Sequence, residues 1–260
     1  MPRSLAMEIL SAIASSARNH HRHHDDGPVI DRDFEVGEFQ DLQVAGPFDT
    51  EVETGETASV HASGPEWALE SLRVEHEGDR LIIGCDGDCD GDVTIAVTVQ
   101  GLRSLRSAGS GDVSLDRASG KRFECSNTGS GDLSIDSVEA DKFELASAGS
   151  GDIRIDKIRG AEFEATMMGS GDFSLDAVES SALRLTMNGS GDVVIGEYCG
   201  DRAEVRLTGS GDLAIDTVEA KDVEMSVFGS GDVLISRGRA TSATVQISGS
   251  GDIGSEGLAL

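Results

Sequence analysis

Apolar and polar residues alternate in short stretches along most of the chain, and from residue 109 the alternation recurs every 20 residues. Counted from its opening Gly-Ser-Gly-Asp tetrapeptide, each repeat has apolar residues at positions 5 and 7 and again at positions 15 and 17. Alternation with period two predicts two short strands per repeat, each with one face inside. The tetrapeptide begins at Gly109, Gly129, Gly149, Gly169, Gly189, Gly209, Gly229 and Gly249, without insertion or deletion.

Two short strands cannot bury an apolar face by themselves, so successive repeats are expected to stack. Parallel stacking at about 4.8 Å pairs each strand with its equivalent in the next coil and forms one continuous core. The sequence therefore predicts an all-β protein, a single-stranded parallel β-helix (solenoid) with 20-residue coils. Right-handed winding is expected from the strong bias of parallel crossover connections.

The variation along two columns of residues supports this fold. Position 15 shrinks from Phe in the first three repeats to Ala, Val and Ala in the last three, while position 19 grows from Asn127 and Ser147 to Val227 and Ile247. Close packing needs a nearly constant volume per layer, so both columns are expected to face one interior. Position 16 is mostly acidic, and three coils have a basic residue two positions earlier, Arg122, Lys142 and Arg202, which predicts a solvated charge ladder.

We divide the chain into three segments. Residues 1–33 are expected to be a leader with signal-like features followed by a His-rich linker, residues 34–108 irregular opening coils with the N-terminal cap, and residues 109–260 the regular β-helix. Residues 34–260 then form one continuous domain. Within the opening part, Pro65 to Leu69 is expected to be a turn or short helix that covers the first layer.

The leader leaves several alternatives open. Arg3 and the small residues ending at Ala17 are typical of an export signal, but Glu8 interrupts the apolar run, so an amphipathic helix or a disordered leader also fits. His20, His21, His23 and His24 form either a metal-binding tract or a polar linker. No stretch approaches the roughly 18 apolar residues of a transmembrane segment.

Charge restricts the partners. Asp and Glu number 48 against 21 Lys and Arg, which gives a net charge of −27. Such a chain repels polyanions, so nucleic acid is not an expected partner.

The fourth residue of each tetrapeptide forms a column of carboxylates. Neighbouring charges about 4.8 Å apart repel by about 0.9 kcal/mol in water, so something must offset the repulsion. Calcium is one answer, and hydrogen bonding of the carboxylates within the turns is the other. We favour a structural turn column. Calcium-binding nonapeptide repeats carry ligand loops on both edges of each coil, whereas this sequence has one Gly-Ser-Gly-Asp loop per 20 residues. The column comprises Asp112, Asp132, Asp152, Asp172, Asp192, Asp212, Asp232 and Asp252.

The segment from Cys85 to Asp92 offers a second candidate site. Asp86, Asp88 and Asp90 occupy the first ligand positions of an EF-hand-like loop, and Asp92 follows, but Val97 stands where a bidentate Glu is required. These four carboxylates are candidate calcium ligands. Cys85 and Cys89 are close enough to form a disulfide across the turn, whereas Cys125 is expected in the core.

The opening FQDLQVAGPFDTEVETGETASVHASG, then EHEGDRLIIG, then VTVQGLRSLRSAGSGDVSL with further GSGD coils resembles the bacterial family called putative autotransporter adhesin, head GIN domain. The resemblance covers about residues 36–255. It implies a single-chain parallel β-helix exported to the cell envelope, with adhesion suggested by the name and no catalytic residues or cofactor. The chain departs from this pattern by lacking a clean signal peptide or a lipoprotein cysteine near its start.

We therefore expect a non-catalytic cell-envelope protein, an adhesin or a binding or structural scaffold, located in the periplasm or at the cell surface, with a cytoplasmic location still open. The alternatives are a calcium-binding solenoid and a β-helical polysaccharide-active enzyme, although one Trp and one Tyr offer few platforms for stacking sugars. A protein or cell-surface ligand is the expected partner, with Val194, Phe228 and Leu234 as a candidate partner face. For the C-terminal coil two alternatives stay open: end-to-end self-association through its unpaired strand edge, or a tail, Gly254 to Leu260, that folds back as a small lid.

Overall fold

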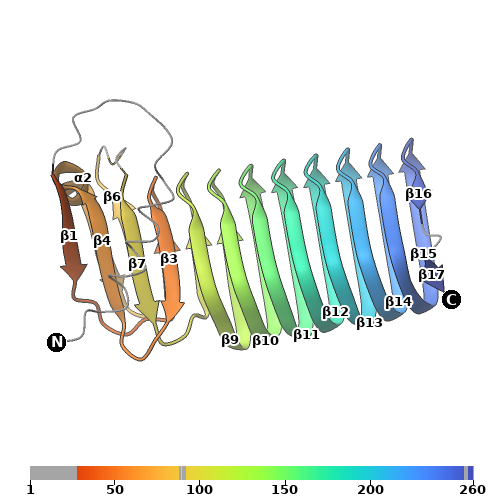
Figure 1. Ribbon diagram of the computed structural model, residues 1–260, viewed down its shortest axis with the longest axis horizontal. Helices are drawn as coiled ribbons and strands as arrows, with labels where there is room; N and C mark the ends of the chain where they lie inside the picture. Colours follow the sequence, from red (N-terminus) through yellow and green to blue (C-terminus); the bar gives the residue numbers. More distant parts are fainter. Residues whose placement is uncertain (1–27, 88, 90–91, 255–256, 260) are drawn as a thin grey trace.

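The regular part of the molecule is a parallel β-solenoid. The computed structural model describes residues 28–87, 89, 92–254 and 257–259. Each coil contributes one long strand, and each strand pairs in parallel with the next at an offset of 20 residues, as in Leu133↔Ile153 and Phe143↔Phe163. The coils follow one another along the long axis (Figure 1). The predicted all-β solenoid with 20-residue coils is thus confirmed. Its long strands are β9 (Val113–Asn127), β10 (Leu133–Gly149), β11 (Ile153–Gly169), β12 (Phe173–Gly189), β13 (Val193–Gly209), β14 (Leu213–Gly229) and β15 (Val233–Gly249).

The two strands expected in each repeat are joined into one bent strand with three faces. In β10 the inward alternation is interrupted at Asp136–Ser137 and at Asp141–Lys142, where two consecutive residues point outward. These outward pairs are corners, and they divide each coil into face A (positions 5–7), face B (positions 10–12) and face C (positions 15–19). Face B was not among the predicted strands. Its position 10 is buried in six of the coils: Ala118, Val138, Ile158, Val178, Tyr198 and Val218.

Aromatic side chains stack along the core. The rings of Phe123 and Phe143 lie 5.4 Å apart, and those of Phe143 and Phe163 lie 4.9 Å apart. All three are almost completely buried, as is Cys125. The predicted shared interior of positions 15 and 19 is therefore confirmed in the first three coils, where Phe at position 15 faces Asn127, Ser147 and Met167 at position 19.

The Gly-Ser-Gly-Asp corners stack directly on one another. A Cβ atom on Gly129 would overlap the carbonyl oxygen of Gly109, and one on Gly131 would overlap that of Gly111. Only glycine allows the backbones of successive coils to approach so closely. This contact explains why both glycines recur in each copy of the tetrapeptide.

The opening region extends two of the three faces. Face A continues from β9 through β3 (Asp49–Thr54), β7 (Thr94–Val99) and β4 (Ser59–Pro65) to β1 (Val29–Phe34). Face C continues through β8 (Ser104–Ser107), β2 (Asp41–Val44) and β6 (Arg80–Cys85) to β5 (Leu72–Glu77). Between β4 and β5 the chain forms the short helix α2 (Glu66–Ser71), which confirms the predicted helix or turn. The β structure begins at Val29, a few residues before the expected domain boundary.

The C-terminal end is covered only in part. Strand β16 (Ile253–Gly254) pairs with face A of β15, and β17 (Leu258–Ala259) pairs with its face B at Gly238 and Arg239. Within the described residues, face C of β15 has β14 on one side and no strand on the other. Its inward residues Ala243, Val245 and Ile247 are half-buried, whereas their equivalents in β14 are buried.

Candidate functional site

The carboxylate column forms a hydrogen-bonded ladder. The backbone N–H of Asp132 donates to Oδ1 of Asp112 at 2.8 Å, and each later aspartate repeats this bond to the one before it. The ladder starts in the opening region, where the N–H of Asp112 donates to Oδ1 of Asp49 at 3.0 Å. Each carboxylate therefore accepts a bond from the next coil, and these bonds offset part of the repulsion along the column. Calcium is not needed to explain this arrangement, and the structural role of the column stays the prediction.

A second aspartate column lies at position 8. Asp116 accepts hydrogen bonds from the N–H and hydroxyl of Thr54, each at 3.0 Å, and Arg154 forms ion pairs with Asp156 and Asp176. Asp136 has no such partner among the described residues. Partial burial, followed by the charges of Asp156 and Asp116, raises its pKa.

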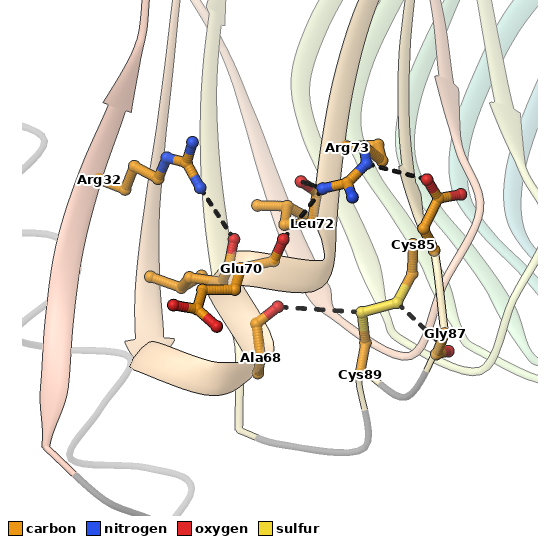
Figure 2. A network of polar contacts seen from close by, with 10 residues as sticks. Arg32, Ala68, Glu70, Leu72, Arg73, Cys85, Gly87 and Cys89 are labelled. Atoms are coloured by element: carbon orange, nitrogen blue, oxygen red, sulfur yellow. Dashed lines mark hydrogen bonds and ion pairs between the residues drawn. A yellow bond between two sulfur atoms is a disulfide. The ribbon is translucent and has the colours of Figure 1, made fainter.

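In the candidate loop, Cys85 and Cys89 lie beside α2 (Figure 2). Cys85 and Cys89 are joined in a disulfide, with their Cα atoms 6.4 Å apart. Arg73 forms an ion pair with Asp86 at 2.9 Å, so the charge of this carboxylate already has a partner. Val97, which stands at the last EF-hand position, is a buried residue of β7.

Two of the four calcium ligands expected in this loop, Asp86 and Asp92, lie within the described residues. Asp88 and Asp90 lie outside the described residues, and Asp92 is exposed. Among the described residues, no group of three or more His, Cys, Asp or Glu side chains is arranged to hold a metal ion. Calcium binding here therefore stays a prediction.

The carbonyl groups at the end of α2 have partners from three segments. Arg32 of β1 donates to Leu69 O at 3.0 Å, and Arg73 donates to Glu70 O at 2.9 Å and to Leu72 O at 3.2 Å. The N–H of Asp86 donates to Ser71 O at 3.0 Å. Since the last carbonyls of a helix lack partners within it, these bonds fix the cap on the first layer of the core. The bonds from Arg32 and Asp86 could not be predicted from the sequence, because these residues lie far from α2 along the chain.

The charge ladder on face C matches expectation. Lys142 pairs with Glu144 at 2.7 Å, Arg122 pairs with the same carboxylate, and Arg202 pairs with Glu224 at 2.9 Å. Lys142 holds the pKa of Glu144 below its usual value. These exposed pairs contribute little stability each. Together they give this part of face C a solvated surface of paired charges.

The described surface has shallow recesses of about 280 to 340 Å³. One lies over face A where the opening strands meet the first coils, and carboxylates of Asp49, Glu51, Asp112 and Asp132 line it. Burial, with the nearby charge of Glu53, raises the pKa of Glu51.

Exposed apolar side chains gather near the tetrapeptide corner of the late coils. Phe228 precedes this corner and is 46% exposed, while Leu234 follows it and is 52% exposed. Val194, two coils earlier in the column of Leu234, is 43% exposed. At the position of Val194 and Leu234 the first two coils carry Ser114 and Ser134. We call Val194, Phe228 and Leu234 the late-coil apolar corner.

No helix among the described residues is long and apolar enough to cross a membrane.

Solved structures show the same fold. A putative adhesin from Parabacteroides merdae matches with a TM-score of 0.75 at 16% identity, covering 88% of this chain and 97% of that one. A putative lipid binding protein from Parabacteroides distasonis matches at 0.73 and 21%, covering 88% and 96%. A putative adhesin from Bacteroides fragilis matches at 0.61 and 18%, covering 87% and 96%. At these identities the likeness establishes the fold alone.

No curated protein matches the chain. The family model described as putative auto-transporter adhesin, head GIN domain, matches residues 38–156 and again residues 144–259. Together the two matches span nearly all of the solenoid, including the opening strands. The chain therefore belongs to the family of putative auto-transporter adhesins with a head GIN domain.

Proposed function

We propose that this protein is a non-catalytic extracytoplasmic scaffold that binds a protein or cell-surface ligand through the late-coil apolar corner. Membership of an adhesin family supports an extracytoplasmic, ligand-binding role. The observation that carries the proposal is the exposure of Phe228 and Leu234 on either side of one corner. Large exposed apolar side chains rimmed by polar residues mark interaction surfaces.

The surroundings of this corner fit a binding surface. The aspartates of the corner itself, Asp192, Asp212 and Asp232, come between the positions of Phe228 and Leu234 along each coil and place charged groups beside the apolar side chains. The rigid stack of coils holds these side chains at fixed spacing, so little conformational entropy is lost on binding. Anionic surfaces are disfavoured as ligands by the net charge of −27.

The test is binding of purified protein to intact bacterial and host cells, measured as a saturation curve. The variant Val194→Ser, Phe228→Ser, Leu234→Ser should bind at least tenfold more weakly. A matched control, Ser114→Thr, Thr128→Ser, Ser134→Thr, changes the equivalent corner of the early coils and should bind like the unmodified protein.

Equal binding by both variants would exclude the late-coil apolar corner. The non-catalytic part is tested separately by incubating the protein with a panel of cell-surface polysaccharides. Release of shortened chains or reducing ends would overturn that part, whichever variant binds.

A further inference from the structure

The last coil presents a strand edge whose apolar side chains are only half covered. On face C of β14 the inward residues Val223, Met225 and Val227 are at most 2% exposed. Their neighbours Ala243, Val245 and Ile247 on β15 are half-buried, because β16 and β17 cover faces A and B only. One column of the core therefore reaches the surface at this point.

The backbone of the same three residues also points to the open side. On face C of the first coil, outward residues donate toward the preceding layer: Glu124 N–H to Arg103 O at 3.0 Å and Thr128 N–H to Ser107 O at 2.9 Å. Amide groups alternate in direction along a strand. The N–H and C=O groups of the inward residues Ala243, Val245 and Ile247 are thus directed away from β14. On that side of β15 the described residues place no partner strand over face C.

The surroundings indicate what fits on this edge. Strands β16 and β17 already form the next layer over faces A and B, so one extended segment over face C would complete that layer. Residues 240–249 carry no charge, and Arg237 and Arg239 are the only charged residues between Asp232 and Asp252. An uncharged edge lacks the charged residues with which natural proteins discourage strand pairing.

We propose that the edge of β15 from Ala243 to Ile247 is a binding site for an extended polypeptide segment that adds as one further strand. The segment would bear aliphatic side chains at alternate positions, which cover Ala243, Val245 and Ile247 as each coil covers the one before it. Main-chain hydrogen bonds supply affinity in this mode of recognition, and the alternate side chains supply specificity. This site is separate from the late-coil apolar corner and does not depend on it.

The probe is a fluorescent peptide with the sequence of residues 221–229, the segment that already packs against face C of β15 from the other side. Its control carries Ser in place of Val223, Met225 and Val227. Fluorescence anisotropy should show saturable binding of the probe and at least tenfold weaker binding of the control.

Two variants at one position separate the edge from its side chain. Val245→Pro removes an N–H that makes no bond to β14, so the solenoid should fold while peptide binding falls at least tenfold. Val245→Thr keeps this N–H and nearly the same shape, and should bind within about threefold of the unmodified protein. If Val245→Pro does not fold, Val245→Lys serves as the blocking variant, because it places a charge in the slot while keeping the amide.

Hydrogen exchange supplies an independent readout. The amides of Ala243, Val245 and Ile247 should exchange fast in the free protein and slow at least tenfold when the peptide is bound. Amides that are already protected in the free full-length chain would overturn the proposal, because the edge is then covered. Equal binding by the Pro and Thr variants would overturn it as well. A concentration-dependent dimer that persists in Val245→Pro would show instead that a second copy docks on this end without strand addition.

Discussion

The opening region and the repeated coils satisfy their polar groups in different ways. In the opening region several polar groups have individual partners: Arg32, Arg73 and the N–H of Asp86 donate to separate carbonyls at the end of α2, and Arg103 pairs with Asp41 at 2.7 Å. In the coils each residue lies beside the residue at the same position of the next coil, so where that position is constant one solution, such as the aspartate ladder, is reused in each layer. Repetition thereby stacks like charges, which individual pairing avoids.

The same contrast separates the two ends. At the N-terminal end the outermost strands β1 and β5 carry Asp31, Arg32, Asp33 and Arg73, Glu75, Glu77, while α2 covers the core between them. At the C-terminal end the face-C edge is uncharged, and its core column is half exposed. Charged edge strands and a capping element prevent unwanted strand pairing. Among the described residues, the N-terminal end thus has charged edge strands and a cap that discourage strand addition, and face C at the C-terminal end lacks both.

The largest expected change in unfolding free energy comes from comparing a leucine-to-alanine substitution at the N-terminal end with one at the C-terminal end. Leu69 of α2 is 1% exposed, whereas Leu258 of β17 is only partly buried. Leu69→Ala should cost about 3 kcal/mol of unfolding free energy, because it leaves a cavity under the cap, and Leu258→Ala less than about 1 kcal/mol. Urea denaturation followed by circular dichroism gives both values.

Hydrogen exchange by mass spectrometry serves as the control, since a repeat protein can unfold from one end. Leu69→Ala should accelerate exchange in β4, β5 and β6 before the middle coils. Equal costs for the two leucines would contradict the view that only the N-terminal end is capped.

A smaller effect is expected from the disulfide beside the cap. The double variant Cys85→Ser, Cys89→Ser removes a short loop constraint, which corresponds to about 2 kcal/mol in the chain-entropy view. The loss should be confined to α2 and its neighbouring strands, and dithiothreitol should reproduce it in the unmodified protein. Cys125, whose pKa burial raises to about 12, should stay unreactive in the folded protein, whereas exposed Cys199 should react with a thiol reagent. Four reactive thiols after denaturation without reductant would show that the disulfide is absent.

Much of the fold could be predicted because a repeat multiplies each signal. The period of 20, the inward columns at positions 5, 7, 15 and 17 and the capping helix near Trp67 all follow from patterns within a few residues. Face B was missed because Ala118 and Tyr198 differ greatly in size and position 12 is often Gly. Tyr198 is fully buried, and its hydroxyl donates to Arg202 O at 2.6 Å beside Gly200, a local solution that no average over repeats reveals.

The candidate sites were less predictable, because they depend on contacts between coils. The sequence located the aspartate column, but whether a carboxylate accepts a bond within its own turn or from the next coil depends on how the corners stack. The partners of Asp86 and of the α2 carbonyls lie on strands distant in sequence. The open edge of β15 is likewise set by where β16 and β17 pair, which short, weakly patterned segments do not indicate.

The smallest predicted effect compares one carboxylate from each region. In the opening region, hydrogen bonding to Arg103 lowers the pKa of Asp41, whereas in the coils partial burial and neighbouring aspartates raise the pKa of Asp136. A lowered pKa means that Asp41 stabilises the fold above the ordinary value of 3.8, and that this contribution is lost as pH falls through its folded pKa. A raised pKa means that ionised Asp136 destabilises the fold at neutral pH, and that this cost disappears as pH falls toward 3.8.

Asp41→Asn should therefore lower the melting temperature at pH 7, and Asp136→Asn should raise it. Each change should amount to a fraction of a kcal/mol, since solvent screens both groups. Both differences from the unmodified protein should shrink as the pH falls below 3.8. Asp136 is then protonated in both the folded and the unfolded state. Asp41 is then protonated in the unfolded state, and its contribution disappears as the pH falls through its lower folded-state pKa. Thermal denaturation of the three proteins at pH 7, 5 and 3 makes the comparison. A loss of stability in Asp136→Asn at pH 7 would show that the position-8 column is stabilised by its charges, contrary to the view that repetition imposes a cost which the individually paired opening region avoids.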